Sequence, residues 1–276
     1  MEAENTVQEL MVLARAEITV EIGGVAVRVH STNDNFLEML ERRYAGFVSF
    51  GKGAEFEFDI ELAEPSGGDA DAELRVTWDS GLWRVERGDF AAEFNPLTRR
   101  GRIRQSPSPY SIDAVFRILH TLLLAREGGF LLHAASAIRN GKAFVFAGVS
   151  GAGKTTIASL APADATLLTD EISYVRKDGD GYAAFGTPFT GELGKLGENV
   201  CAPISGLYLL EKGAQNRIAP VTAAEASRAF LANVLFFAED QELVRAVFRS
   251  ACEFVDQVPV YRLTFVPDSR VWEMLT

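Results

Sequence analysis

One short stretch of the chain combines glycines, a lysine and threonines at a spacing suited to binding phosphate. Glycine adopts backbone conformations closed to other residues, so a glycine-rich loop can turn several N–H groups toward one anion. In this P-loop pattern, Lys154 would reach the β- and γ-phosphates of a nucleotide and the Thr155 hydroxyl would bind Mg²⁺. The residues predicted to bind the nucleotide are Gly148, Ser150, Gly151, Ala152, Gly153, Lys154, Thr155 and Thr156.

The sequence on both sides of this loop has the order that a P-loop requires. Before the loop, "KAFVFAG" (142–148) is an apolar run typical of a buried strand. After it, "KTTIASLA" (154–161) is compatible with a helix, whose positive dipole end would face the same anion. The order strand, loop, helix favours nucleotide binding over a chance match to the pattern.

Two adjacent carboxylates, Asp170 and Glu171, follow the next predicted strand, "TLLT" (166–169). A short buried strand beside the P-loop strand would present both acids from its C-terminal end, near the γ-phosphate and the metal ion. The alternative is a pair of solvated turn residues. The strand-like run that leads directly into the acids favours a functional role.

One of the chain's three histidines, His133, stands in the first half of a predicted hairpin. The segment "FLLHAASAIRNGKAFVFAG" (130–148) has an Asn-Gly turn between two strands. Because the strands of a hairpin are antiparallel, His133 is expected near the glycine loop. A histidine beside an acid and a phosphate can tune proton transfer. The alternative is a strand histidine satisfied by backbone carbonyls.

Together, this hairpin, "GVSGAGKT" (148–155) and "LLTDE" (167–171) resemble the catalytic domain of the bacterial HPr kinase/phosphorylases. They resemble more closely the HPr-kinase-related proteins found in peptide-modification gene clusters. The resemblance covers residues 112–266 and implies a phosphoenolpyruvate-carboxykinase-like α/β P-loop domain with a mixed parallel and antiparallel sheet. It also implies that Asp170 is the base that accepts the proton of the acceptor hydroxyl, with His133 close to it. Glu171 would help Thr155 to hold Mg²⁺.

One segment differs from the HPr kinases. Their arginine-bearing signature segment has no counterpart here, and "GTPFTGELGKLGEN" (186–199) stands in its place. This difference argues against HPr as the acceptor and against the reverse phosphorylase reaction. The side chains of the segment that are available to contact phosphate or substrate are Thr187, Thr190, Glu192 and Lys195.

The two parts of the chain have unlike patterns. Residues 1–108 carry short alternating segments such as "EITVEIGGVAVRVH" (17–30), which predict a small antiparallel α+β domain for recognition or assembly. Residues 109–276 are predicted to form the P-loop nucleotide-binding kinase-like domain. It would begin with a helix over 112–129, capped by Ser111, on which His120 is expected to be structural.

Composition narrows the classes of partner. The 276 residues carry a net charge of −11 and no lysine- or arginine-rich tract, which argues against nucleic acid or an anionic membrane surface as a partner. The segment "MEAENTVQEL" lacks the positive charge of a signal peptide, and no apolar run is long enough to span a membrane, so a cytoplasmic location is predicted. Cys201 and Cys252 lack a metal-binding spacing and are expected in the core. A homo-oligomer remains open.

These features predict an ATP- and Mg²⁺-dependent kinase that phosphorylates a Ser or Thr hydroxyl on a protein or peptide substrate. Two alternatives remain open at this point. One is a nucleotide-binding regulatory module without phosphoryl transfer, and the other is a small-molecule kinase.

Overall fold

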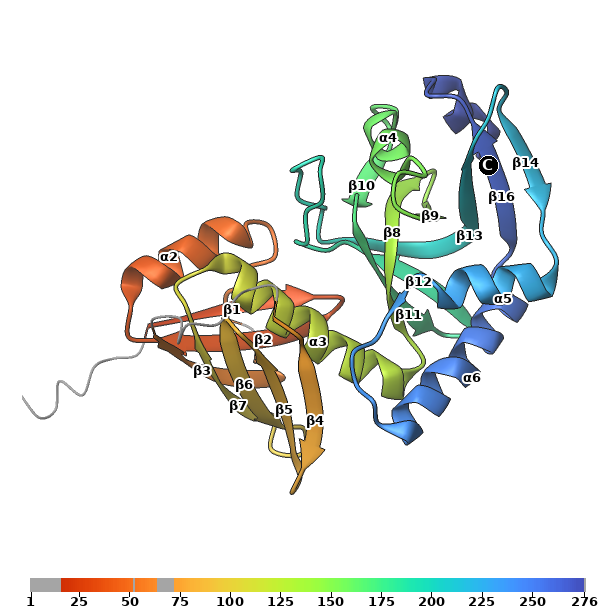
Figure 1. The fold of residues 1–276 in the computed structure, drawn as a ribbon. Helices are drawn as coiled ribbons and strands as arrows, with labels where there is room; N and C mark the ends of the chain where they lie inside the picture. The colour runs from red at the N-terminus through yellow and green to blue at the C-terminus, as the bar shows by residue number, and fades with distance from the viewer. Residues whose placement is uncertain (1–15, 52, 64–71, 276) are drawn as a thin grey trace, which may run out of the picture. The chain divides into compact units, whose positions relative to one another are not determined.

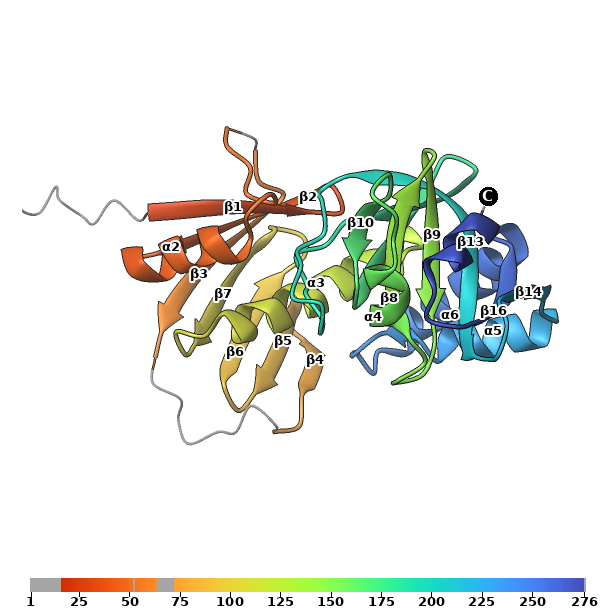
Figure 2. The same cartoon turned by 90° about the horizontal axis from the view of Figure 1, so that it is seen from above.

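The computed structural model describes residues 16–51, 53–63 and 72–275, so the segment "MEAENTVQEL" lies outside the described residues. The chain divides into two compact units (Figures 1 and 2). The first contains the residues up to Glu21 together with Val25–Ile112, and the second contains Ile22–Gly24 together with the residues from Asp113 onward. The division therefore falls inside helix α3 (Pro109–Glu127), whereas the sequence placed it at residues 108/109.

The described part of the first unit contains a seven-stranded sheet in the order β1-β2-β3-β7-β6-β5-β4. The hairpin predicted over 17–30 is confirmed, because both central glycines of its turn, Gly23 and Gly24, have the positive φ angles, 61° and 80°, that a tight hairpin needs. The elements of this unit before α3 are β1 (Ala16–Ile22), β2 (Val25–Ser31), α2 (Asp34–Arg43), β3 (Phe56–Leu62), β4 (Arg75–Asp79), β5 (Leu82–Arg87), β6 (Phe90–Asn95) and β7 (Arg100–Gln105).

The predicted antiparallel character of the first unit is wrong in one respect. Strand β3 pairs in parallel with both of its neighbours, β2 and β7. Parallel strands need a crossover connection, and α2 lies in the one between β2 and β3. Alternation of polar and apolar residues identifies strands, but it does not say in which direction two strands pair.

The second unit is an α/β unit in which parallel and antiparallel strands mix. Its described residues form a nine-stranded sheet. The strands and helices after α3 are β8 (Phe130–Arg139), β9 (Lys142–Ala147), α4 (Lys154–Ser159), β10 (Thr166–Thr169), β11 (Ile172–Asp178), β12 (Gly181–Phe185), β13 (Cys201–Lys212), β14 (Arg217–Pro220), α5 (Ala223–Leu231), β15 (Val234–Leu235), α6 (Gln241–Gln257), β16 (Val260–Phe265) and the 3₁₀ helix η1 (Ser269–Met274).

Strand β8 organises this sheet because its two halves have different partners. Its first residues, Phe130–His133, pair with β11, and its later residues pair with β9 and β10. The predicted β8–β9 hairpin is confirmed, and its turn residues Asn140 and Gly141 have φ angles of 53° and 73°. The register pairs Ala134 with Ala147, the last residue before the glycine loop, so His133 lies near that loop.

The carboxyl ends of three strands consequently meet at one edge of the sheet. Strands β9 and β10 both run antiparallel to β8, and β13 runs parallel to β9, so β9, β10 and β13 point the same way. The sequence placed β10 directly beside β9, whereas β8 lies between them in the structure. Loops at the carboxyl ends of such strands form the usual ligand site of α/β sheets.

Helix α3 begins earlier than the sequence predicted. It starts at Pro109, and Ser111 lies in its first turn instead of capping it. The Ser111 hydroxyl donates to Asp89 Oδ2 at 2.7 Å. The expectation that both cysteines lie in the core is also wrong, since Cys201 and Cys252 are exposed. None of the helices in the described ranges has the length and apolar character needed to cross a membrane.

Candidate phosphate-binding site

One pocket, with a volume of about 280 Å³, brings most of the predicted site residues together, whereas Gly148 and Ala152 are not among the residues that line it. The lining residues come from β8, the glycine loop after β9, the start of α4, the end of β10 and the residue that follows it, the segment after β12 and the end of β13. Convergence follows from the shared carboxyl edge of β9, β10 and β13. The lining residues are His133, Ser150, Gly151, Gly153, Lys154, Thr155, Thr156, Asp170, Glu171, Gly191, Glu192 and Lys212.

The loop needs glycines for two reasons, which are positive φ angles and neighbouring atoms that leave no room for a Cβ atom. Gly151 and Gly153 have φ angles of 75° and 110°, in the region that side-chain-bearing residues rarely adopt. A Cβ atom on Gly153 would lie 2.8 Å from Phe265 Cζ, and one on Gly148 would lie 2.8 Å from Ala152 Cβ. The φ angles agree with the prediction that glycines give this loop backbone conformations closed to other residues.

Lys154 is the first residue of α4 and is 8% exposed. Its Nζ donates to the carbonyl oxygens of Gly148 at 2.9 Å and Val149 at 3.4 Å. Burial lowers the pKa of its ammonium, and Glu171 and Glu192 act in the opposite direction. Within the described ranges, no carboxylate forms a salt bridge with Lys154. A buried ammonium held by carbonyls favours an anion as its further partner.

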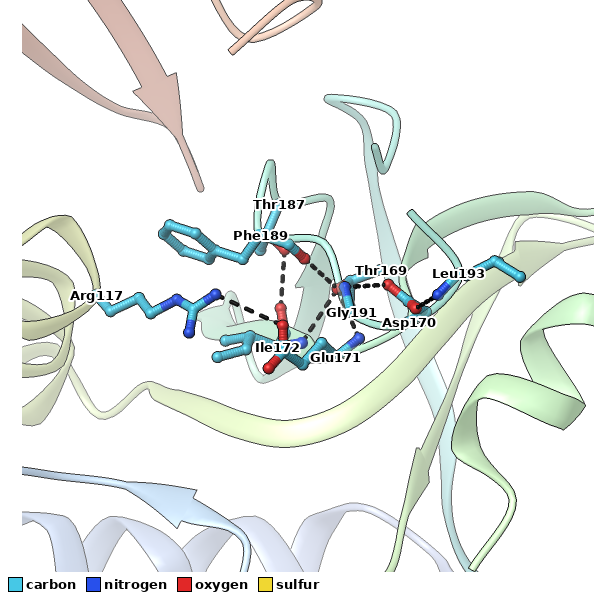
Figure 3. Close-up of polar contacts among 9 residues, drawn as sticks. All are labelled: Arg117, Thr169, Asp170, Glu171, Ile172, Thr187, Phe189, Gly191 and Leu193. Carbon is cyan, nitrogen blue, oxygen red and sulfur yellow. Dashed lines mark hydrogen bonds and ion pairs between the residues drawn. The ribbon is translucent and has the colours of Figure 1, made fainter. Parts of the chain in front are cut away.

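Asp170 is 2% exposed, and both of its oxygens accept backbone hydrogen bonds (Figure 3). Oδ1 accepts from Gly191 N and Oδ2 from Leu193 N, each at 2.8 Å. These contacts fix the backbone on both sides of Glu192, whose position faces the pocket. A Cβ atom on Gly191 would lie 2.9 Å from Asp170 Oδ2, so the glycine permits this close approach. No pattern in the sequence predicted this anchoring role.

Glu171 faces the pocket beside a residue that the sequence did not single out, Arg117 of α3. Arg117 Nη2 lies 3.5 Å from Glu171 Oε2, and the guanidinium carbon lies 4.8 Å from the ring centroid of Phe189 (Figure 3). Arg117 stands in a mostly apolar helical run, so nothing in its sequence context predicts contact with a distant acid.

Two threonines shape the turn that carries the acids (Figure 3). Thr169 Oγ1 accepts from the backbone N–H groups of Glu171 and Ile172, both at 3.1 Å. Thr187 is fully buried, and its hydroxyl donates to Ile172 O at 2.9 Å. Thr187 is therefore a structural residue and not the phosphate contact that the sequence offered. Of the four candidates in the segment 186–199, Glu192 lines the pocket.

His133 and His120 differ in the way the structure uses them. Burial lowers the pKa of His133, and the positive charges of Lys154 and Arg117 add to this effect, so its imidazole is neutral at neutral pH and can accept a proton. His120 is fully buried, with Nδ1 3.2 Å from the Tyr174 hydroxyl, and burial lowers its pKa to about 3. It is structural, as the sequence predicted.

The pocket contains oxygen-bearing side chains that could hold a metal ion. Thr155 and Glu171, the predicted metal ligands, both line the pocket. In the ranges that the structure describes, no group of three or more His, Cys, Asp or Glu side chains is arranged to hold a metal ion. Mg²⁺ needs no such group when phosphates and waters supply most of its ligands.

The second unit is thus an α/β unit whose glycine loop, lysine and acids line one pocket, and the comparison with known families concerns this unit. Residues 110–276 match the model of the family described as SynChlorMet cassette protein ScmC. The match covers more than half of the chain, so the chain belongs to this family. It extends over every lining residue of the pocket. A search of the curated proteins found no match.

Proposed function

We propose that the chain is an ATP- and Mg²⁺-dependent kinase that transfers the γ-phosphoryl group to a Ser or Thr hydroxyl of a protein or peptide. The observation that carries the proposal is the single pocket lined by Lys154, Thr155, Asp170, Glu171 and His133. Phosphoryl transfer depends mainly on positioning and charge neutralisation, and these residue types supply both.

The proposal includes a phosphoenolpyruvate-carboxykinase-like P-loop fold for the second unit. Its support is the mixed pairing around the P-loop strand, since β9 is antiparallel to β8 and parallel to β13. The resemblance of the His-bearing hairpin, "GVSGAGKT" and "LLTDE" to HPr kinases points to the same fold.

The loop and Lys154 would bind the phosphates. Bound phosphate oxygens would replace the Gly148 and Val149 carbonyls as partners of the ammonium, because a hydrogen bond between two charged groups is the stronger one. Thr155 and Glu171 would hold Mg²⁺, which supplies neutralisation of the phosphoryl charge when it is bound with the nucleotide. Binding the metal would compete with the Arg117–Glu171 ion pair.

Asp170 and His133 would handle the acceptor proton. Each carboxylate oxygen of Asp170 accepts one backbone N–H and keeps further acceptor capacity toward the pocket. A base fixed in this way loses little orientational freedom when the acceptor hydroxyl arrives. His133 is neutral at neutral pH and lines the same pocket, so it can share the proton.

The size of the pocket favours an acceptor that projects a small group into it. A volume of about 280 Å³ lies just below the range of roughly 300–1,000 Å³ usual for ligand pockets. It suits the phosphate tail and a hydroxyl-bearing side chain. A protein or peptide presenting Ser or Thr meets this requirement.

A second function, a nucleotide-binding regulatory module without transfer, is favoured by one observation. Both oxygens of Asp170 are already engaged by backbone N–H groups of the segment that bounds the pocket. In that case Asp170 would not act as a base. It would transmit the binding of a nucleotide to the segment that contains Gly191 and Leu193.

The experiment incubates the full chain with γ-labelled ATP, Mg²⁺ and peptide libraries that contain one Ser or Thr each, and it measures ATP binding in parallel. A kinase labels a subset of the peptides, and Lys154→Ala lowers labelling by about 1,000-fold or more. Lys142→Ala, at the far end of β9 from the loop, is the matched control and should behave as the wild type. Binding without labelling of any peptide or of the chain itself would favour the regulatory module. Absence of nucleotide binding would exclude both functions.

A further inference from the structure

One carboxylate of the pocket, Glu192, has no part in the transfer proposed above. Glu192 lines the pocket and is exposed, whereas Asp170 is 2% exposed. It therefore stands at the mouth of the pocket, where a molecule arriving from solvent meets it. Among the described residues, no lysine, arginine or histidine forms an ion pair with Glu192, and Lys195 of the same segment does not line the pocket.

The backbone holds Glu192 in place. Asp170 accepts hydrogen bonds from the N–H groups of Gly191 and Leu193, the residues on either side of Glu192 (Figure 3). Gly194 N donates to Gly191 O at 3.1 Å, so residues 191–194 form a turn. A group held in this way loses less conformational freedom when a partner binds. The exposed carboxylate is consequently presented by the same turn that anchors the proposed base.

The charges around the pocket nearly balance before a nucleotide binds. The acids that line the pocket are Asp170, Glu171 and Glu192, and the bases are Lys154 and Lys212, together with the neutral His133. Arg117 does not line the pocket, but it pairs with Glu171. The empty pocket therefore has little preference for one sign of charge.

A bound nucleotide would change this balance. A nucleoside triphosphate brings more negative charge than one Mg²⁺ neutralises. Phosphate would also engage Lys154, the ammonium on which Glu192 now acts. Glu192 would then stand beside an excess of negative charge, and a cation on the acceptor would offset it.

We propose that Glu192 selects acceptors that carry Lys or Arg close in sequence to the phosphorylated Ser or Thr. This inference rests on the proposed function, because it names the class of peptide that the kinase accepts. The basic side chain pairs with Glu192 at the mouth while the hydroxyl enters toward Asp170. The net charge of −11 acts in the same direction, since it attracts basic peptides from a distance.

Peptide binding to the full chain, saturated with Mg²⁺ and a non-hydrolysable ATP analogue, tests the inference. Each fluorescent peptide contains one Ser and, at one nearby position, Arg, Gln or Glu. At one or more positions, Arg should bind about five- to tenfold more tightly than Gln. This preference should disappear in Glu192→Gln, and in Glu192→Lys the Glu peptide should bind best. The control Glu198→Gln replaces an exposed acid of the same segment that does not line the pocket, and it should keep the preference.

A metal-binding role of Glu192 predicts a different result. Calorimetric titration of Glu192→Gln with the ATP analogue and Mg²⁺ should give the affinity of the wild type. A loss of about tenfold or more would place Glu192 among the metal ligands and would overturn the inference. Circular dichroism checks that each variant is folded.

The labelling assay distinguishes a failure of this inference from a failure of the proposed function. Labelling of peptides without a preference for a basic residue would overturn the inference and leave the kinase in place. So would nucleotide binding without binding of any peptide. Binding of Arg peptides that depends on Glu192, without labelling, would support the recognition of basic peptides and overturn the proposed transfer.

Discussion

One sheet face of the first unit and the pocket of the second unit use charged side chains in opposite ways. On the exposed face of the first sheet, charges of opposite sign stand on neighbouring strands, and Glu57 lies 2.8 Å from Arg100 on β7 and 3.9 Å from Arg28 on β2. In the second unit, Lys154 and Asp170 are buried, and they are bonded to backbone carbonyl and amide groups instead.

The comparison distinguishes exposed charges, which pair with one another, from buried charges, which bond to the backbone and remain available to a ligand. Exposed ion pairs contribute about 0–1 kcal/mol each and mainly help strand register and solubility. A buried charge is costly unless its hydrogen bonds are satisfied, and backbone dipoles satisfy it without neutralising it. The buried lysine and aspartate therefore keep their charges available to a ligand.

The largest effect should come from Asp170→Asn, which replaces one acceptor oxygen by an amide nitrogen that cannot accept from Gly191 or Leu193. We expect a loss of about 1–3 kcal/mol in the free energy of unfolding, because a buried N–H group loses its partner. If Asp170 is the base, peptide labelling should fall by about 100- to 10,000-fold as well. Chemical denaturation and the labelling assay measure the two effects. Asp180→Asn, in the exposed turn between β11 and β12, is the control, and equal effects of both variants would contradict the anchoring role.

Gly191→Ala tests the same anchor from the other side. The new Cβ would lie 2.9 Å from Asp170 Oδ2 and 3.0 Å from Glu171 Cβ, so one of the acids has to move. We expect a destabilisation of about 1–3 kcal/mol and weaker nucleotide binding. Gly181→Ala is the matched control, because a Cβ there meets no atom within 4 Å. Calorimetric titration with nucleotide should separate the two variants, and similar affinities would contradict the tight packing at residue 191.

His120→Gln extends the comparison to a buried group that is neutral. The pKa of His120 is lowered to about 3, so the unfolded chain binds its proton as the pH falls below about 6.5 while the folded chain does not. As the pH is lowered from about 6.5 to about 3, the free energy of unfolding should therefore fall by up to about 1.4 kcal/mol per pH unit. In His120→Gln this part of the slope should disappear, although stability near pH 7 is lower. Hydrogen exchange of peptides from α3 and β11, measured from acid to neutral pH, checks the slope. An unchanged slope would show that His120 does not cause it.

The smallest effect should come from the exposed pairs of the first unit. Arg100→Gln removes a partner of Glu57, and we expect a change of about 0.5 kcal/mol or less. The change should shrink further at high salt, because exposed charges are screened. Thermal unfolding at low and high salt measures it. A loss above about 2 kcal/mol would place this pair with the buried charges of the second unit.

The local features of the fold could be predicted from the sequence because local rules govern them. The Asn140–Gly141 turn, the strand–loop–helix order and the strand before Asp170 each depend on a few adjacent residues. The antiparallel register of one hairpin was enough to predict that His133 lies near the loop. The pocket then follows from strand directions.

Features that depend on distant residues could not be predicted. The parallel pairing of β3 depends on where β7 returns after a long connection. The hydrogen bonds of Asp170 depend on a segment about 20 residues later in the chain. The contact of Glu171 with Arg117 depends on a helix more than 50 residues earlier. The exposure of Cys252 depends on which face of α6 packs inward, and the residue type alone does not reveal that face.

The change of partners along β8 decides which parts of the second unit the proposed nucleotide site needs. Because His133 stands where β8 changes partners from β11 to β9 and β10, neither half of the sheet holds a complete binding surface. Excising the glycine loop with its own strand and helix would yield a fragment without affinity. A bound nucleotide should consequently protect peptides throughout the second unit against proteolysis, since ligand that binds only the assembled state stabilises all of the cooperative unit.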